Sequence, residues 1–436
     1  MRKFFIDTIL TTIFIFAILW TLNGISQLNI FDALDPISQA LEDTELTDYA
    51  FSSLRVEDPP IDTNIIIVNT GALSREMIGR QIEIMNSLEP KVIAVDIIFS
   101  CDGGLRDSVN CPQAYDTLGN RVLGDAVRNA KNIVMAHKLW QTRLIRETED
   151  TDVYDSLEHT DEHLRINAYE GFVNLITGAD HQEDLKICRE FNPAKYVTGE
   201  KHYAFSVQTA MLYDSFTTQN FLDRENEIEI VNYRGNIVDW HGASTYAGRY
   251  IVLDWDQALD TSTFATGMIK DKIVLMGYLG DDLRDTSWDD KFFTPLNKKF
   301  GGRARPDMYG VVVHANIISM ILNKDYVEQL ADWQKYLFAV IICYFNVALF
   351  WLIFFRLPLL FDTLQISLQL MQLATFAVLI PYMFYWYQLK MDITIGLVAL
   401  ALAGPCFEIY ITVIDFGVNY VRKKWLTKTE NEVLTT

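Results

Sequence analysis

Four long apolar segments dominate the hydropathy pattern of the chain. The first covers residues 4–22, and three more follow one another closely at about residues 336–355, 364–387 and 393–416. A helix of about 20 residues spans roughly 30 Å, which is the thickness of the hydrocarbon layer of a membrane. The pattern therefore predicts four transmembrane helices, one before and three after a long polar segment.

The first apolar segment has two readings, an uncleaved membrane anchor or a secretory signal peptide. Its apolar run is longer than the core of a signal peptide, and no Ala-x-Ala cleavage site follows it in residues 22–29. We therefore interpret residues 4–22 as an anchor.

Basic residues flank the predicted spans on one side. Arg2 and Lys3 precede the first span, Arg356 follows the second, and the Arg-Lys-Lys run at residues 422–424 follows the fourth. The short loop on the opposite side has one basic residue, Lys390. The positive-inside rule then predicts cytoplasmic termini and a large segment on the other side of the membrane.

This external segment alternates short apolar runs with amphipathic stretches. Residues 64–68 form a β-branched run typical of a buried strand, residues 74–88 have helical periodicity behind the capping residue Ser74, and residues 91–99 predict a second strand. Strand, helix and strand form a βαβ unit, so we expect an α/β domain with a mainly parallel sheet flanked by helices. Further strands are predicted at residues 132–136, 228–233, 250–253 and 272–276, and further helices at residues 120–131, 202–214 and 311–322.

Together these patterns divide the chain into four regions. They are an N-terminal transmembrane helix (residues 1–23), an extracytoplasmic domain (24–333), three transmembrane helices (334–424) and a short cytoplasmic tail (425–436). Within the domain, residues 139–200 are charged and weakly periodic, and we interpret them as an irregular insertion.

The charge of the chain limits its partners. Its formal net charge is −20, and all but seven of its 57 acidic residues lie between residues 24 and 335. Such a surface repels nucleic acid and anionic lipid headgroups. It suits a basic partner, a cation or simple solubility.

The five cysteines fall into two groups. Cys101 and Cys111 bracket a loop on the predicted oxidising side, and we expect them to form a disulfide. Their spacing would also permit a metal pair, but no histidine or further cysteine is near them in sequence. Cys343 and Cys406 lie in predicted spans and suit packing, which leaves Cys188 unpaired.

Common catalytic motifs are absent from the sequence. It contains no P-loop, no Gly-x-Gly-x-x-Gly, no Gly-x-Ser-x-Gly elbow and no His-Glu-x-x-His. Of the seven histidines only His159 and His163 have the i, i+4 spacing of a helical metal pair, and their acidic surroundings favour a solvated charged helix instead. We therefore predict no enzyme, no catalytic residue, no metal and no cofactor.

Polar residues and glycines follow the ends of several predicted strands. Ligands of open parallel sheets bind outside the carboxyl ends of the strands, so these residues form a candidate ligand-binding rim. The alternative is that they cap helices and tie loops without binding anything. The rim consists of Asn69, Asp96, Asn232, Arg234, Gly277, Gly280 and Asp285.

Three segments together carry a family resemblance. The first is the opening strand–helix–strand, with IIIVNTG at residues 65–71 and KVIAVDIIFS at residues 91–100. The second is Asn-Tyr-Arg-Gly at residues 232–235, and the third is residues 272–316, which hold KIVLMG, a Thr-Pro pair and Val-His-Ala-Asn. In this combination they resemble the second class of CHASE domain, a sensory extracellular domain associated with bacterial cyclases and histidine kinases.

The resemblance implies a sensory module in the bacterial inner membrane, with its large domain in the periplasm. Members of the family usually continue into a cyclase, kinase or phosphatase domain, whereas twelve residues follow Lys424 here. Any output is therefore expected to pass through the membrane helices to a separate membrane or periplasmic protein. A small-molecule ligand is possible, but the family pattern does not identify it.

Two functional interpretations remain open. The chain is either a ligand receptor that acts on a separate protein, or a structural subunit of a multiprotein envelope complex without ligand sensing. Glu408 lies in the middle of the fourth predicted span and is the candidate for a polar contact inside the membrane. Its partner is expected to be a helix of this chain or a second subunit, and a proton-linked role is a further alternative.

Overall fold

The computed structural model describes residues 2–26, 45–54, 59–101, 105, 107–141, 154–177, 187–238, 243–298 and 305–433. The chain divides into two compact units. One comprises residues 1–47 and 328–436, and the other residues 48–327.

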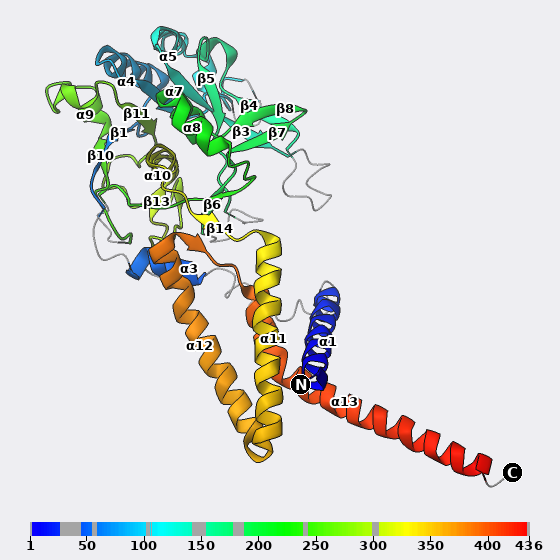
Figure 1. Ribbon diagram of the computed structural model, residues 1–436. Helices are drawn as coiled ribbons and strands as arrows, with labels where there is room; N and C mark the ends of the chain where they lie inside the picture. Colours follow the sequence, from blue (N-terminus) through cyan, green and yellow to red (C-terminus); the bar gives the residue numbers. More distant parts are fainter. Residues whose placement is uncertain are drawn as a thin grey trace. The chain divides into compact units, whose positions relative to one another are not determined.

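The unit of residues 48–327 is built on a seven-stranded sheet (Figure 1). The strand order is β10-β1-β11-β2-β3-β4, and β5 also pairs with β3. Every neighbouring pair is parallel except β3 with β4. This confirms the predicted α/β class with a parallel sheet. The strands are β1 (Asp62–Asn69), β2 (Val92–Val95), β3 (Ile133–Trp140), β4 (Ser156–His159), β5 (Tyr169–Phe172), β10 (Tyr250–Leu253) and β11 (Ile273–Gly277).

Helices cover both faces of this sheet. On one face α4 (Arg75–Ser87) and α5 (Thr117–Asn129) pack together over a core that includes Val68 of β1. Because successive strand residues point to opposite faces, the equally buried Ile67 points to the other face. There α7 (Phe205–Tyr213) and α10 (Gly310–Asn323) contact each other and the strands.

Helix α10 is the central helix of this unit. Every residue from Gly310 to Ile321 is buried, including the polar ones, so the helix is surrounded by protein on all sides. The predicted helix at residues 311–322 is confirmed.

Small elements complete the unit. Two antiparallel pairs, β6 with β9 and β12 with β13, and the β7–β8 hairpin lie outside the main sheet. The elements are α3 (Leu46–Tyr49), β6 (Glu190–Phe191), β7 (Ala194–Val197), β8 (Glu200–Tyr203), α8 (Ser215–Leu222), β9 (Glu229–Ile230), α9 (Trp255–Ala258), β12 (Lys291–Phe292) and β13 (Met308–Tyr309), with short turns of helix at Ala50–Leu54, Pro112–Tyr115, Glu162–Leu164 and Thr266–Met268.

The prediction of an irregular insertion at residues 139–200 is wrong for the described part of that stretch. Strand β3 runs on to Trp140, β4 and β5 join the main sheet, and β7 and β8 form a hairpin. These four later strands have four residues each, which is too short for an alternating pattern to stand out among charged residues. Residues 142–153 and 178–186 lie outside the described residues.

Three predicted boundaries are also wrong. The run at residues 228–233 contributes only β9, outside the main sheet, because the rest of it is a loop buried against α10. The strand predicted to reach residue 99 ends at Val95, since its neighbour β11 ends at Gly277. Helix α7 begins at Phe205 rather than residue 202, because the preceding residues belong to β8.

The unit of residues 1–47 and 328–436 is helical. Within the described residues it holds four helices that are long and apolar enough to cross a membrane. Ile15, Phe350 and Phe407, from three of the helices, share one buried core. The helices are α1 (Arg2–Ser26), α11 (Asp332–Arg356), α12 (Phe361–Tyr387) and α13 (Thr394–Val433), with a turn of helix at Pro358–Leu360 and the short pair β14 (Glu328–Gln329) and β15 (Leu389–Lys390).

Candidate functional site at the carboxyl edge of the sheet

The carboxyl ends of β1 and β11 are joined by Asn69, the last residue of β1, which is fully buried. Its Nδ2 donates to Asp254 Oδ1 at 2.8 Å and to the carbonyl oxygen of Gly280 at 3.2 Å. Its Oδ1 accepts from the N–H groups of Gly71 and Leu279, both at 2.9 Å. Both ends of this amide are engaged by protein, so Asn69 ties three loops together.

Two predicted rim glycines allow close contacts at the same edge. A Cβ on Gly277 would lie 2.8 Å from the Cβ of Val311 in α10. Gly280 has φ +92°, and a Cβ there would collide with the side chain of Asp285. These glycines let the ends of the strands approach α10.

The carboxylate of Asp285 organises the loop after β11. It accepts hydrogen bonds from the N–H of Ser287 at 2.8 Å, the hydroxyl of Ser287 at 3.0 Å and the N–H of Asp281 at 3.1 Å. These bonds, with the Ser287 N–H bond strongest, lower the pKa of Asp285. The carboxylate is therefore ionised and held in place by its own loop.

Asp96 and Asp290 form a pair of acids at the end of β2. Burial of its carboxyl and the neighbouring Asp290 raise the pKa of Asp96. Asp290 as a whole is exposed, but its carboxylate lies close to the start of α10. Both of its oxygens are 3.3 Å from the point that a Cβ on Gly310 would occupy. This crowding raises the pKa of Asp290 as well. Because the charge of one acid disfavours the charge of the other, a positively charged group near both would stabilise their ionised forms.

A small hollow lies beside this edge. Its volume is about 40 Å³, enough for about three water molecules, and it is lined by Asp285, Trp288, Lys291, Asp307 and Tyr309 among others. In this arrangement it has room for a small group of a ligand but not for a whole organic molecule.

A second, larger cleft lies between the β7–β8 hairpin and α8. Its volume is about 600 Å³, which is within the range of organic-ligand sites. Tyr154, Tyr203 and Phe221 contribute aromatic surface to it, and Lys195 and Glu227 contribute charge. Nothing in the sequence pattern predicted this cleft, because its walls come from short elements on both sides of residue 200 that no spacing motif connects.

Two predicted rim residues, Asn232 and Arg234, do not lie at the strand ends. Arg234 binds both carboxylate oxygens of Asp325, at 2.5 and 2.6 Å, and Asn232 Nδ2 donates to the carbonyl oxygen of Asp325 at 3.0 Å. The backbone between them is held by Asn316 of α10, whose Oδ1 accepts from the Arg234 N–H at 2.9 Å. The structure therefore separates the predicted rim into the strand-end edge and an α10 clamp made of Asn232, Arg234, Asn316 and Asp325.

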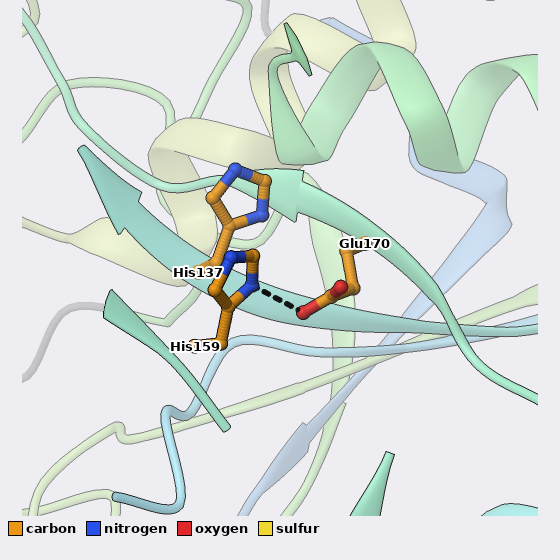
Figure 2. Close-up of side chains that lie close together, drawn as sticks. All are labelled: His137, His159 and Glu170. Atoms are coloured by element: carbon orange, nitrogen blue, oxygen red, sulfur yellow. Dashed lines mark hydrogen bonds and ion pairs between the residues drawn. The ribbon is translucent and has the colours of Figure 1, made fainter. Parts of the chain in front are cut away.

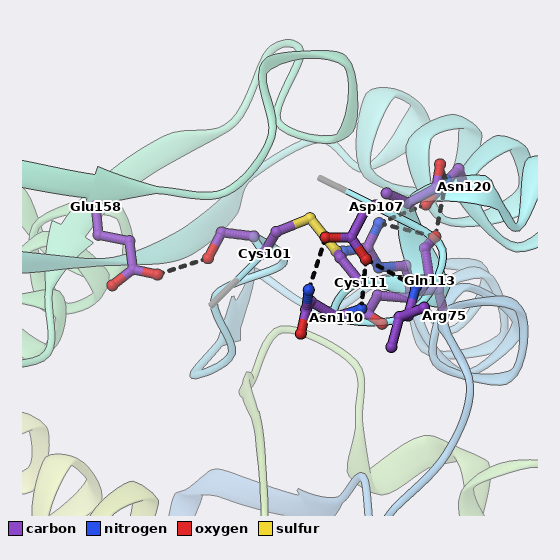
Figure 3. Close-up of a disulfide and its surroundings, with 11 residues drawn as sticks. Arg75, Cys101, Asp107, Asn110, Cys111, Gln113, Asn120 and Glu158 are labelled. Atoms are coloured by element: carbon purple, nitrogen blue, oxygen red, sulfur yellow. Dashed lines mark hydrogen bonds between the residues drawn. A yellow bond between two sulfur atoms is a disulfide. The ribbon is translucent and has the colours of Figure 1, made fainter. Parts of the chain in front are cut away.

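Cys101 and Cys111 form the expected disulfide, and both are buried (Figure 3). Within the closed loop the carboxylate of Asp107 accepts from the N–H groups of Val109 and Asn110 at 2.9 and 2.8 Å. These hydrogen bonds lower the pKa of Asp107. The described part of this loop at residues 107–111 is thus held by the disulfide and by a turn of its own.

A histidine cluster lies at the meeting point of β3, β4 and β5 (Figure 2). His137, His159 and Glu170 place one nitrogen or oxygen each within 4.8 Å of one another. The solvated charged helix expected across His159 and His163 is wrong, because His159 ends β4 and His163 lies in the following turn of helix. The cluster could not be read from spacing, since its members come from three strands.

Glu408 lies on α13 in the helical unit and is exposed within the described residues. Gln365 Nε2 of α12 donates to Glu408 Oε1 at 3.4 Å. Gly404, one turn earlier on α13, makes room for that amide, because a Cβ there would collide with Gln365. A weak bond within the chain therefore leaves part of this carboxylate open to the surroundings of the helices.

The two units define a class of protein: an α/β unit with one helix before it and three helices after it that are long and apolar enough to cross a membrane. One family has a sequence model that matches this chain, the CHASE2 domain, over residues 12–355. The chain belongs to the CHASE2 domain family, a family of extracellular sensory domains. No curated protein and no solved structure matches the chain.

Proposed function

We propose that this chain is a sensory protein of the bacterial inner membrane that binds a ligand in the periplasm and acts on a separate membrane protein. The observation that carries the proposal is the CHASE2 match, which begins in the first apolar helix and ends in the second. The positive-inside distribution of basic residues supports cytoplasmic termini. No catalytic role is proposed for any residue.

The proposed ligand site is the strand-end edge, and the proposed ligand carries a positive charge. Burial raises the pKa values of both Asp96 and Asp290, and the charge of Asp290 adds to the rise at Asp96, so a cationic group beside them would favour their ionised forms. The edge also touches the start of α10 through Gly277 and Gly310. A ligand at this edge would therefore contact α10, the helix that precedes the second apolar helix, α11, in the chain.

Thermal unfolding of the full-length protein in mild detergent tests this site. Spermidine serves as the cationic probe, with sodium chloride at matched ionic strength as the control. At a concentration of about 100 Kd, binding adds about 2.7 kcal/mol to the stability of the folded protein. At about 2–4 °C per kcal/mol for a unit of this size, the melting temperature rises by roughly 5–10 °C.

Variants locate the binding. Asp96→Asn should abolish the rise, whereas Asp282→Asn removes an exposed acid from the neighbouring loop and should retain it. Lys195→Ala, in the larger cleft, should also retain it. A rise that survives Asp96→Asn and disappears in Lys195→Ala would move the ligand site to the cleft, and no rise in the unmodified protein would refute a cationic ligand of this kind.

A second candidate function, a structural subunit of an envelope complex without ligand sensing, is favoured by the exposed carboxylate of Glu408. Placing a carboxylate against lipid costs several kcal/mol, and contact with a helix of a partner protein would reduce this free-energy cost. Glu408→Gln should reduce co-elution of associated membrane proteins in mild detergent. Asp362→Asn, near the start of α12, is the matched control, and equal co-elution of both variants and the unmodified protein would exclude the contact.

A further inference from the structure

The strand register brings three metal-ligating side chains to one place. His137 of β3 lies directly opposite His159 of β4. Strand β5 also pairs with β3, and this pairing places Glu170 opposite Met135, two residues before His137. The two imidazole rings are 5.2 Å apart between centroids, and His159 Nδ1 donates to Glu170 Oε1 at 2.8 Å. Figure 2 shows the two rings next to each other with the carboxylate beside His159.

His137 is the unexplained member of this cluster. It is 1% exposed, and neither of its ring nitrogens has a hydrogen-bond partner among the described residues. Burial, with the nearby His159, lowers its pKa to about 4, so at neutral pH the ring is uncharged and has a free lone pair. A buried polar group without a partner is costly, and native proteins seldom keep one without a reason.

A third imidazole borders the same space. The ring of His202 on β8 is 5.5 Å from that of His137, and its Nε2 is buried without a partner among the described residues. Arg165 binds Oε2 of Glu170, and Oε1 is the oxygen directed at His159. Hydrogen bonding and charge from His159 and Arg165 outweigh burial and lower the pKa of Glu170, which keeps the carboxylate ionised.

We propose that His137, His159 and Glu170 bind a divalent transition-metal ion, in the first place Zn²⁺, with His202 available for the fourth position. Two imidazoles and a carboxylate are a recurring zinc ligand set, and four-coordinate tetrahedral geometry is the preference of this ion. For Nδ1 of His159 to coordinate the ion, its proton has to sit on Nε2 instead. The side chains of His159 and Glu170 are 29% and 20% exposed, which gives an ion a route from solvent.

Metal titration of the full-length protein in mild detergent tests the site. The protein is stripped with a chelator, dialysed and titrated with Zn²⁺, and Co²⁺ is used in parallel because its visible spectrum reports tetrahedral coordination. We expect one bound ion per chain. His159→Ala and Glu170→Gln should each weaken binding by about a hundredfold, at or beyond the upper end of losses seen for residues that only orient a ligand. Both side chains are partly exposed, so these variants are expected to fold.

The matched control is His163→Ala, which removes an exposed histidine four residues from His159 and should leave binding unchanged. Zn²⁺ should also raise the melting temperature of the unmodified protein and of His163→Ala, but not that of Glu170→Gln. Absence of binding to the unmodified protein, or equal affinity of His159→Ala and His163→Ala, overturns the site. The strand-end edge shares none of these residues, so the result is independent of the proposed ligand.

Discussion

Replacing Asn316 by alanine should remove the side-chain amide that bonds the loop at residues 232–235 to α10. Asn316 is 1% exposed. Its Oδ1 accepts from the N–H groups of Arg234 and Gly235 at 2.9 and 3.4 Å, and its Nδ2 donates to the carbonyl oxygens of Gly235 and Val312 at 2.9 Å each. A single side-chain amide of α10 therefore forms hydrogen bonds with a loop that lies more than 80 residues away in sequence.

The size of the effect follows from which groups lose their partner. In Asn316→Ala two groups of the loop lose bonds of 2.9 Å, the N–H of Arg234 and the carbonyl oxygen of Gly235, and the N–H of Gly235 loses a longer and weaker one of 3.4 Å. Val312 keeps the helical hydrogen bond that its carbonyl makes in α10. Each stranded buried group costs about 1–3 kcal/mol, so the loss is about 4 kcal/mol for the two. For a unit of this size that corresponds to a fall of roughly 8–16 °C in melting temperature.

The assay is thermal unfolding of the full-length protein in detergent at one fixed scan rate. Asn323→Ala is the matched control, because Asn323 is on the same helix and its amide bonds only to Ser319 one turn earlier, at 2.8 Å to the carbonyl oxygen. That local bond is worth about 1 kcal/mol, so the control should melt within about 4 °C of the unmodified protein. Equal melting temperatures for the two variants would show that the clamp contributes nothing beyond a local bond.

Three further predictions concern the same unit. Burial raises the pKa of Asp307 to about 7 despite hydrogen bonds from Thr294, so between pH 4 and 7 the folded state holds a proton that the unfolded state has released. The free energy of unfolding therefore falls as pH rises through this window, by up to about 1.4 kcal/mol per pH unit. Asp307→Asn should flatten the dependence of the melting temperature on pH in the same window. Cys101→Ser opens a short disulfide loop and should lower the stability of the folded protein by about 3 kcal/mol. The unmodified protein should melt at the same temperature as this variant when a reductant is present. A melting temperature that does not respond to the reductant would contradict the prediction. In Gly280→Ala the residue has a positive φ and its new Cβ would collide with the side chain of Asp285, so this variant should destabilise the protein more than Gly199→Ala, where φ is +90° and no atom lies within 4 Å. Equal melting temperatures would show that the close approach of Gly280 to Asp285 is unimportant.

The parts of the fold that the sequence predicted are those with a strong local signal. Strands β1, β10 and β11 are short apolar runs between polar residues, and each was expected within two residues of its observed bounds. Helix α4 begins after Ser74, whose hydroxyl accepts from the Met77 N–H, as the capping position predicted. In these segments the residues that determine the structure are neighbours in the chain.

The candidate rim shows where local reasoning stops. Asn69 and Asp285 were expected at the edge because they follow β1 and β11, and they lie there. Asn232 and Arg234 were expected there because an apolar run precedes them, but that run is buried by contact with α10 and not by strand pairing. A continuous apolar run reports burial and does not distinguish a strand from a packed loop.

The histidine cluster fails to appear in the sequence for a related reason. Spacing can reveal ligands that share one helix or one loop, whereas His137, His159 and Glu170 come from three strands. Their approach depends on the register of β4 and β5 with β3, and both partner strands lay in the stretch interpreted as irregular. Without those two strands there was no basis for placing the three side chains together.

The segments that carry the family resemblance have a shared structural role. Asn-Tyr-Arg-Gly at residues 232–235 and Val-His-Ala-Asn at residues 313–316 are bonded to each other through Asn316. The Thr-Pro pair contributes Thr294, whose N–H and hydroxyl donate to the carboxylate of Asp307 at 2.9 and 2.7 Å. Asp307 lies three residues before Gly310, the first residue of α10. These motif residues therefore hold α10 in place. Protein already engages the polar groups of Arg234, Asn316 and Thr294, whereas Nδ1 of His314 is buried without a hydrogen-bond partner among the described residues. We therefore expect the motifs to identify the fold and any ligand specificity to come mainly from groups outside them, such as Asp290, whose carboxylate lies against Gly310 at the start of α10.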